Sequence, residues 1–267
     1  GMYLLRKVDL KKIFFIMILK VNNLTVKFLS NKQENDVVRK ISFQLDKNKI
    51  LGIVGESGSG KSVTALAILG LLSENATLEG EIFFKGKDLI NISDKNIQKI
   101  RGRKIGMIFQ EPMSSLNPTL TCGKQVYEVL KQHTGLNKKE IYEEVIALFE
   151  KVKLPNSDRI FNSYPHQISG GQKQRIGIAR ALYFSPEILV LDEATSSLDG
   201  STENVIMDAI HNLSHNKTII IIAHRLQTVR ECDVIHFLEG GHIINSGTFD
   251  ELIEINEHFR KMAHKET

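Results

Sequence analysis

The sequence has few cysteines and no long apolar run, and each of these scarcities excludes a class of protein or site. The only cysteines among the 267 residues, Cys122 and Cys232, lie far apart and cannot form a four-cysteine metal site. So few cysteines are typical of a reducing compartment. No apolar run approaches the roughly 20 residues that cross a bilayer. The longest one near the start, Ile13–Leu19, has seven residues.

The net charge is also low. The formal net charge is +4 and the chain has no dense basic run, so the sequence gives no support to nucleic-acid binding. With 42% hydrophobic and 25% charged residues, the composition is ordinary for a globular protein. The length suits one large domain or a domain with a sizeable inserted lobe. No internal repeat or low-complexity segment occurs.

A glycine-rich segment, Gly55–Ser62, follows the apolar run Ile50–Val54. The run predicts a buried parallel strand, and the Ala- and Leu-rich Val63–Leu72 predicts a buried helix. Glycines between a strand and a helix let the backbone curl around an anion. In such a loop Lys61 would neutralise the β- and γ-phosphates, and the Ser62 hydroxyl would bind Mg²⁺. The sequence therefore predicts a site for a nucleoside triphosphate.

Two carboxylates, Asp192 and Glu193, follow the apolar run Ile188–Leu191. The carboxyl end of a buried parallel strand is where ligands bind in an α/β sheet. We expect Asp192 to hold Mg²⁺ through its coordinated water and Glu193 to polarise the water that attacks the γ-phosphate.

The segment Ser169–Gln172 opens a predicted helix, Gln172–Tyr183, and so forms a second anion-binding helix N-terminus. One chain does not need two such sites for a single γ-phosphate. A head-to-tail dimer does, because each copy can then cover the nucleotide of its partner.

Strands alternate with helices along the remainder of the chain, which predicts a parallel α/β sheet. The almost pure isoleucine run Thr218–Ala223 predicts a central strand buried on both faces. A polar turn at Ser30–Asp36 predicts a hairpin. The other predicted strands are Val21–Phe28, Val37–Leu45, Glu81–Phe84, Lys104–Phe109, Val234–Leu238 and His242–Ile244, and helical patterns cover Val126–Lys151 and Asn204–Leu213.

These motifs together resemble those of the nucleotide-binding subunits of ATP-binding cassette (ABC) transporters, from Met17 to the C-terminus. The resemblance implies a P-loop NTPase core with a mostly parallel sheet, an antiparallel β subdomain and an inserted helical subdomain at about 111–167. We expect Met17–Thr267 to be one domain and Gly1–Ile16 to be an upstream extension.

The resemblance also assigns roles to residues at the family's motif positions. Gln110, as the Q-loop, would contact Mg²⁺ and the water and link hydrolysis to the membrane subunits. His224 would hold the γ-phosphate, and Asp199 would communicate across the dimer. Phe28 matches the aromatic that stacks on adenine, although a strand aromatic can equally belong to the core. The segment Ser169–Gln172 matches the signature motif of the family. The expected nucleotide contacts further comprise Gly55, Glu56, Ser57, Gly58, Ser59, Gly60, Lys61, Ser62 and Val63, with Ser169, Gly170, Gly171 and Gln172 from this signature segment.

The motifs resemble two subfamilies. Gly52–Ser62, Phe109–Pro118 and Tyr164–Gln167 are similar to those of peptide and nickel importer ATPases. Glu193–Asp199 and Ala223–Leu226 are similar to those of exporters such as lipid-linked oligosaccharide flippases. We weigh the importer-like segments more heavily, because Gln110–Pro118 borders the lobe that docks on membrane subunits in this family.

The resemblance therefore implies a peripheral ATPase at the cytoplasmic face of the membrane, using ATP and Mg²⁺ to power transport of a peptide or nickel. Its implied partners are membrane permease subunits, a second ABC ATPase subunit and an extracytoplasmic binding protein. One alternative is an exporter subunit, and another is a soluble ABC ATPase of DNA repair or translation. A natural or engineered hybrid also stays open.

Overall fold

The computed structural model describes residues 17–30, 33–109, 116–193 and 217–265. These residues form two compact units. The first joins the part of the chain up to Lys99 to the part from Lys217, and the second comprises Ile100–Asn216. The predicted extension Gly1–Ile16 and the predicted helix Asn204–Leu213 lie outside the described residues.

The first unit begins with an antiparallel sheet in the order β2-β1-β4-β5. The strands are β1 (Met17–Ser30), β2 (Gln33–Asp46), β4 (Ala76–Phe84) and β5 (Lys87–Asp88). The predicted hairpin of β1 and β2 is confirmed, but the predicted turn Ser30–Asp36 is too long. Ser30 pairs with Gln33, so Gln33–Asp36 belongs to β2, where cross-strand hydrogen bonds outweigh the polarity of its side chains.

A second sheet of this unit has the order β10-β9-β3-β8. Its members are β3 (Ile50–Gly55), β8 (Thr218–Ala223), β9 (Val234–Glu239) and β10 (His242–Gly247). β3 is parallel to both β8 and β9, whereas β10 is antiparallel to β9. Every residue of β3 and β8 is buried, as the apolar runs predict.

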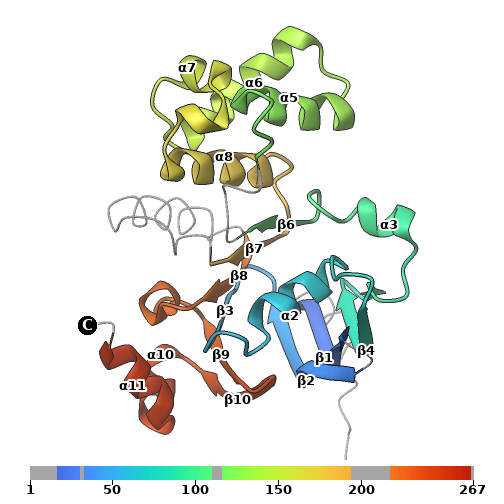
Figure 1. Ribbon diagram of the computed structural model, residues 1–267, viewed down its shortest axis with the longest axis vertical. Coiled ribbons are helices and arrows are strands. Elements are labelled where there is room, and N and C mark those ends of the chain that lie inside the picture. Colours follow the sequence, from blue (N-terminus) through green and yellow to red (C-terminus); the bar gives the residue numbers. More distant parts are fainter. Residues whose placement is uncertain (1–16, 31–32, 110–115, 194–216, 266–267) are drawn as a thin grey trace, which may run out of the picture. The chain divides into compact units, whose positions relative to one another are not determined.

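Helices and turns of the first unit connect or flank these strands (Figure 1). They are α2 (Lys61–Ile68), α3 (Asp94–Gln98), the 3-10 turn η2 (Leu226–Val229), α10 (Phe249–Ile255) and α11 (Glu257–Lys265). The prediction of a helix over Val63–Leu72 is wrong at both ends. α2 ends early because Gly70 takes a left-handed conformation (φ 62) and Leu71 N–H donates to the Leu66 carbonyl at 2.8 Å, which closes the last turn.

The second unit contains the parallel strands β6 (Ile105–Ile108) and β7 (Ile188–Asp192) and a group of helices (Figure 1). The helices are α5 (Cys122–His133), α6 (Lys138–Lys151), α7 (Ser157–Asn162), the 3-10 turn η1 (Pro165–Gln167) and α8 (Gly170–Leu182). The continuous helical pattern predicted over Val126–Lys151 is two helices. Asn137 caps α6, accepting from Lys139 N and Glu140 N, while the Glu140 carboxylate accepts from Asn137 N.

Both cysteines are unpaired and buried. Burial raises the pKa of the Cys122 thiol to about 11 and that of Cys232 to about 12, so both stay protonated at neutral pH. Within the described ranges, no three His, Cys, Asp or Glu side chains cluster as a metal site, and no helix has the length and hydropathy needed to cross a bilayer.

His236, in the middle of β9, should make the first unit sensitive to acid. Its side chain is 8% exposed, its Nδ1 lies 2.7 Å from the Ser246 hydroxyl, and burial lowers its pKa to about 4. The unfolded chain takes up this proton near pH 6.5 and the folded chain only near pH 4, so stability falls as the pH drops between these values.

We expect His236 to account for about 2–3 kcal/mol of the stability lost between about pH 7 and 4.5. Urea unfolding at both pH values measures this loss. The His236→Gln variant should lose less stability over that interval than the wild type, and an equal loss in both proteins would contradict the assignment.

Candidate functional site

The segment after β3 forms a tight backbone loop that favours glycine at three positions. Gly55, Gly58 and Gly60 have φ values of 151°, 79° and 98°. A Cβ on Gly55 would lie 2.0 Å from the Leu238 carbonyl oxygen, far inside contact distance. The loop can therefore follow β9 closely and then turn into α2, as the sequence predicts.

The amino group of Lys61 lies inside this loop. The side chain is 4% exposed, and Nζ donates hydrogen bonds of 2.8 Å to the main-chain oxygens of Gly55 and Glu56. Ser59 N–H also donates to the Glu56 oxygen, at 3.2 Å. The half-buried Ser62 follows in the first turn of α2. A cationic amine and a hydroxyl thus sit at a helix N-terminus, where anions are stabilised.

One buried hydroxyl in the loop indicates what the loop holds. Ser59 is 6% exposed, and its Oγ has no hydrogen-bond partner within the described parts of the chain. Such a group costs about 1–3 kcal/mol when left unpaired. A phosphate oxygen in the loop could accept from this hydroxyl and from the Lys61 amine. The loop therefore fits a nucleotide phosphate.

His224 lies at the same sheet edge as the start of this loop. β3 and β8 run parallel, and Val54 pairs with Ala223 in their register. Gly55 directly follows Val54 and His224 directly follows Ala223, so both residues lie at the same edge of the sheet. Of the predicted site residues, the first unit thus brings together Gly55–Ser62 and His224.

The second unit places the two predicted carboxylates at the end of β7. Ile108 of β6 pairs with Leu191, so Asp192 and Glu193 follow at the carboxyl edge of this strand pair. The two carboxylates are 5% and 7% exposed. Glu193 has a φ of 47°, a strained conformation for a residue with a side chain and one that is concentrated at active sites.

The predicted signature segment begins α8, two residues earlier than the sequence predicts. Ser169 is the N-cap: its Oγ accepts from Gln172 N at 3.3 Å, and the Gln172 amide oxygen accepts from Ser169 N at 3.0 Å. Ser169 and Gly170 are exposed, and no atom lies within 4 Å of a Cβ placed on Gly170. The N-terminus of α8 is therefore accessible to another molecule.

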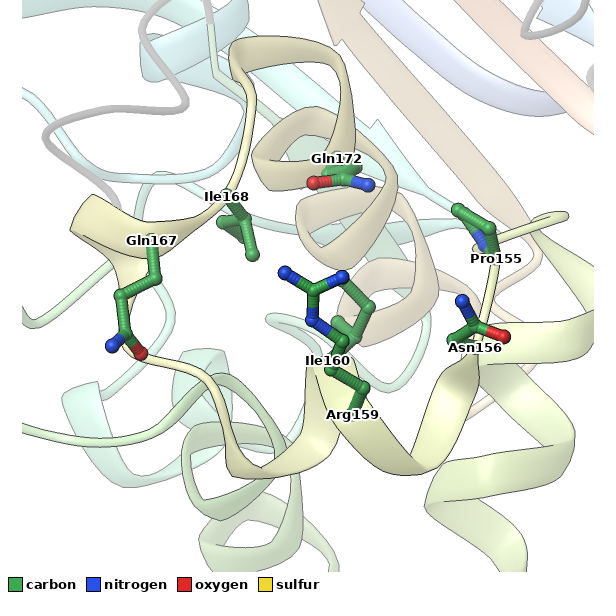
Figure 2. A pocket seen from close by; sticks show the side chains of 7 residues that line it. All are labelled: Pro155, Asn156, Arg159, Ile160, Gln167, Ile168 and Gln172. Carbon is green, nitrogen blue, oxygen red and sulfur yellow. The ribbon is translucent and has the colours of Figure 1, made fainter.

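A pocket of about 80 Å³ lies beside this end of α8 (Figure 2). The Gln167 amide oxygen accepts from Tyr164 N at 2.8 Å, and Gln172 is fixed by the capping bond already described. The hydrogen bonds that begin α8 therefore also shape the pocket. Its lining residues are Pro155, Asn156, Arg159, Ile160, Gln167, Ile168 and Gln172.

The remaining predicted site residues are distributed as follows. Phe28 is half-buried in β1, where it pairs with Asn35 and Ala76, so it is neither fully in the core nor fully exposed. Ser57 is exposed and Val63 is half-buried. Gln110 and Asp199 lie outside the described residues.

Comparison with known proteins identifies the family. The family model described as "ABC transporter" matches residues 38–196, more than half of the chain. The oligopeptide transport ATP-binding protein OppD of Bacillus subtilis is 41% identical over 240 residues, covering 88% of this chain and 67% of that protein. The dipeptide transport ATP-binding protein DppD of Lactococcus lactis is 41% identical over 246 residues, covering 90% and 70%.

Solved structures agree with this result. A dimeric ATP-binding cassette in a post-hydrolysis state, bound to ADP and Pi, has a TM-score of 0.79 at 28% identity and covers 86% of this chain and 98% of that one. A bacterial Atm1-family ABC exporter with ATP bound has a TM-score of 0.76 at 25% identity, covering 94% and 42%. The chain belongs to the ABC transporter family, as an ATP-binding ATPase subunit.

Proposed function

We propose that this ABC ATPase powers the import of peptides through separate membrane subunits, at the cytoplasmic face of the membrane. The observation that carries the proposal is its 41% identity to proteins named for oligopeptide and dipeptide transport, over about nine-tenths of the chain. Because these relatives are named for peptides, they favour a peptide over nickel. We take residues 17–267 as one domain and 111–167 as the lobe that docks on the membrane subunits.

The loop after β3 binds the phosphates. Lys61 neutralises the β- and γ-phosphates, Ser59 donates to a phosphate oxygen, and the main-chain N–H groups of the loop surround the anion. Ser62 and Asp192 would hold Mg²⁺, together with Gln110. The ion, when bound, offsets phosphate charge and needs only one or two protein oxygens beside the nucleotide.

Hydrolysis requires a group that accepts a proton from water. Glu193 takes this role as general base, and His224 holds the γ-phosphate at the edge it shares with Gly55. The exposed segment Ser169–Gln172 of a second copy covers the phosphates, and Asp199 carries the signal between the copies. Phe28 supplies a face for the adenine ring.

A second candidate is an exporter subunit. It is favoured by the exporter-like Ala223–Leu226 after β8 and by the fold similarity to the Atm1-family exporter. In that case the chain would drive a lipid-linked or other outward-moving substrate. The two candidates predict different partners and different stimulating substrates.

Affinity purification of the tagged chain from membranes of its natural host tests the proposal. We expect two permease subunits and a second ABC ATPase to co-purify. In proteoliposomes containing this complex and its binding protein, short peptides should stimulate ATP hydrolysis. Stimulation by lipid-linked oligosaccharide and not by peptides would favour the exporter, and tight binding to DNA or ribosomes without membrane subunits would contradict transport altogether.

A further inference from the structure

The C-terminal helix α11 carries His258, which lies next to the loop Gly55–Ser62 of the same unit. We call this loop the phosphate loop. Phe259 is completely buried, and its ring makes edge contacts with Phe237 of β9 and Phe249 of α10 at centroid distances of 5.8 and 5.5 Å. The Asn256 side chain accepts from Phe259 N at 2.8 Å. The first turn of α11 is therefore fixed against β9, and with it the preceding residue, His258.

Both ring nitrogens of His258 face carboxylates. Nε2 lies 3.2 Å from a carboxylate oxygen of Glu56 in the phosphate loop, and Nδ1 lies 3.5 Å from one of Glu239 at the end of β9. The ring also stands edge-on to Phe237, at 5.5 Å and 89°. A neutral histidine can donate from only one nitrogen, whereas the imidazolium donates from both. Protonation is therefore what allows His258 to bridge the two carboxylates.

Several other charged groups on α11 and beside it have partners of their own. On α11 itself Lys261 pairs with Glu257 at 2.6 Å. Arg260 donates to the main-chain oxygens of Ile253 and Glu254 of α10, at 2.7 Å each. Arg230, after η2, lies over the Phe249 ring. The two carboxylates that contact His258 are thus those of Glu56 and Glu239.

Glu56 connects this histidine to the nucleotide site. Its main-chain oxygen accepts from the Lys61 amine at 2.8 Å and from Ser59 N at 3.2 Å. The same residue therefore contacts His258 through its side chain and supports the phosphate-binding amine through its backbone. Its carboxylate also places a negative charge next to the loop, which opposes phosphate binding unless a cation offsets it.

We propose that protonated His258 is a positioning residue for the nucleotide site, which ties α11 to the phosphate loop through Glu56 and makes nucleotide affinity depend on pH. Histidine is the side chain whose charge commonly changes between about pH 5 and 8. In the neutral form of His258 the bridge to Glu56 is lost, and the Glu56 charge is no longer offset. Affinity should fall with it.

The test is the Kd for ADP with Mg²⁺ at about pH 6 and 8, since ADP probes the loop without hydrolysis. Exposed ion pairs contribute about 0.2–1 kcal/mol. Between these two pH values, the Kd for ADP should therefore rise about two- to fivefold more in the wild type than in His258→Gln. The matched control is His264→Gln on the same helix, because His264 forms no ion pair with any residue that the structure describes. This control should keep the wild-type profile.

A second variant separates positioning from folding. Glu56→Gln keeps His258 and α11 but removes the carboxylate, so it should abolish the additional pH dependence, and adding His258→Gln to it should change nothing further. Equal pH profiles in the wild type and His258→Gln, or an unchanged profile in Glu56→Gln, would overturn the inference alone. A wild-type chain that binds no nucleotide at either pH would overturn the nucleotide site as well.

Discussion

Replacing Glu193 with Gln should lower the rate of ATP hydrolysis by about 10²- to 10⁴-fold and leave ATP binding intact. The amide keeps the shape of the carboxylate but cannot accept a proton from the attacking water. The backbone around it, with its φ of 47°, does not need the charge. Release of phosphate at saturating ATP measures the rate, and equilibrium binding of ATP measures the affinity.

Glu187→Gln is the matched control for this change. Glu187 lies in the same unit, just before β7, and pairs with Lys104 at 3.1 Å. Removing that carboxylate should leave hydrolysis within about twofold of the wild type, since a partly exposed pair contributes 1 kcal/mol at most. If Glu193→Gln hydrolysed ATP at the rate of this control, Glu193 would not be the general base.

Lys61→Ala should weaken ATP binding by about 10- to 150-fold, because hydrogen bonds to a charged group contribute about 1.5–3 kcal/mol. The amine is buried inside the loop, where we expect the phosphates to bind. The defect should appear in the Kd for ATP rather than only in the turnover rate. Isothermal titration of the variant with ATP measures it.

Lys49→Ala provides the comparison for this loss. Lys49 precedes β3, is about half exposed and pairs with Asp233 at 2.6 Å. Its removal deletes a lysine from the same unit but leaves the loop intact, so ATP binding should not change. Equal affinity of Lys61→Ala and Lys49→Ala would show that the loop does not bind phosphate through its lysine. A urea unfolding curve for each variant establishes that both are folded.

The sequence predicts strands β3 and β8 well, because their signal is strong and local. The isoleucine run of β8 and the apolar run of β3 can be satisfied only by burial on both faces, and both strands are found where predicted. The loop Gly55–Ser62 is also predicted from a local signal. Its glycines stand between a strand and a helix, and three of them take the positive φ values that glycine favours.

Helix boundaries were predicted less well, because they depend on capping rather than on apolar spacing. The apolar pattern places Val129, Leu130 and Ile141 on one helix, but the Asn137 cap divides the segment into two helices. Gly70 likewise ends α2 within an Ala- and Leu-rich segment. In both cases a hydrogen bond to an end group decides the boundary, and hydrophobic periodicity does not report on it.

The contacts of α11 could not be predicted from the sequence. Nothing in the spacing of His258 connects it to Glu56, about 200 positions earlier, because the contact depends on how α11 packs against β9. The left-handed conformation of Glu193 is also invisible in the sequence, since the residue carries a side chain that usually avoids it.

We expect two copies of this chain to complete each other's nucleotide site, with Ser169–Gln172 of one copy covering the phosphates at Gly55–Ser62 of the other. Light scattering of Glu193→Gln with ATP and Mg²⁺, combined with a count of bound nucleotide, measures this assembly. We expect a dimer that holds two ATP molecules and that is lost when Lys61→Ala is added. A variant that binds ATP at full affinity and stays monomeric at every concentration would contradict it.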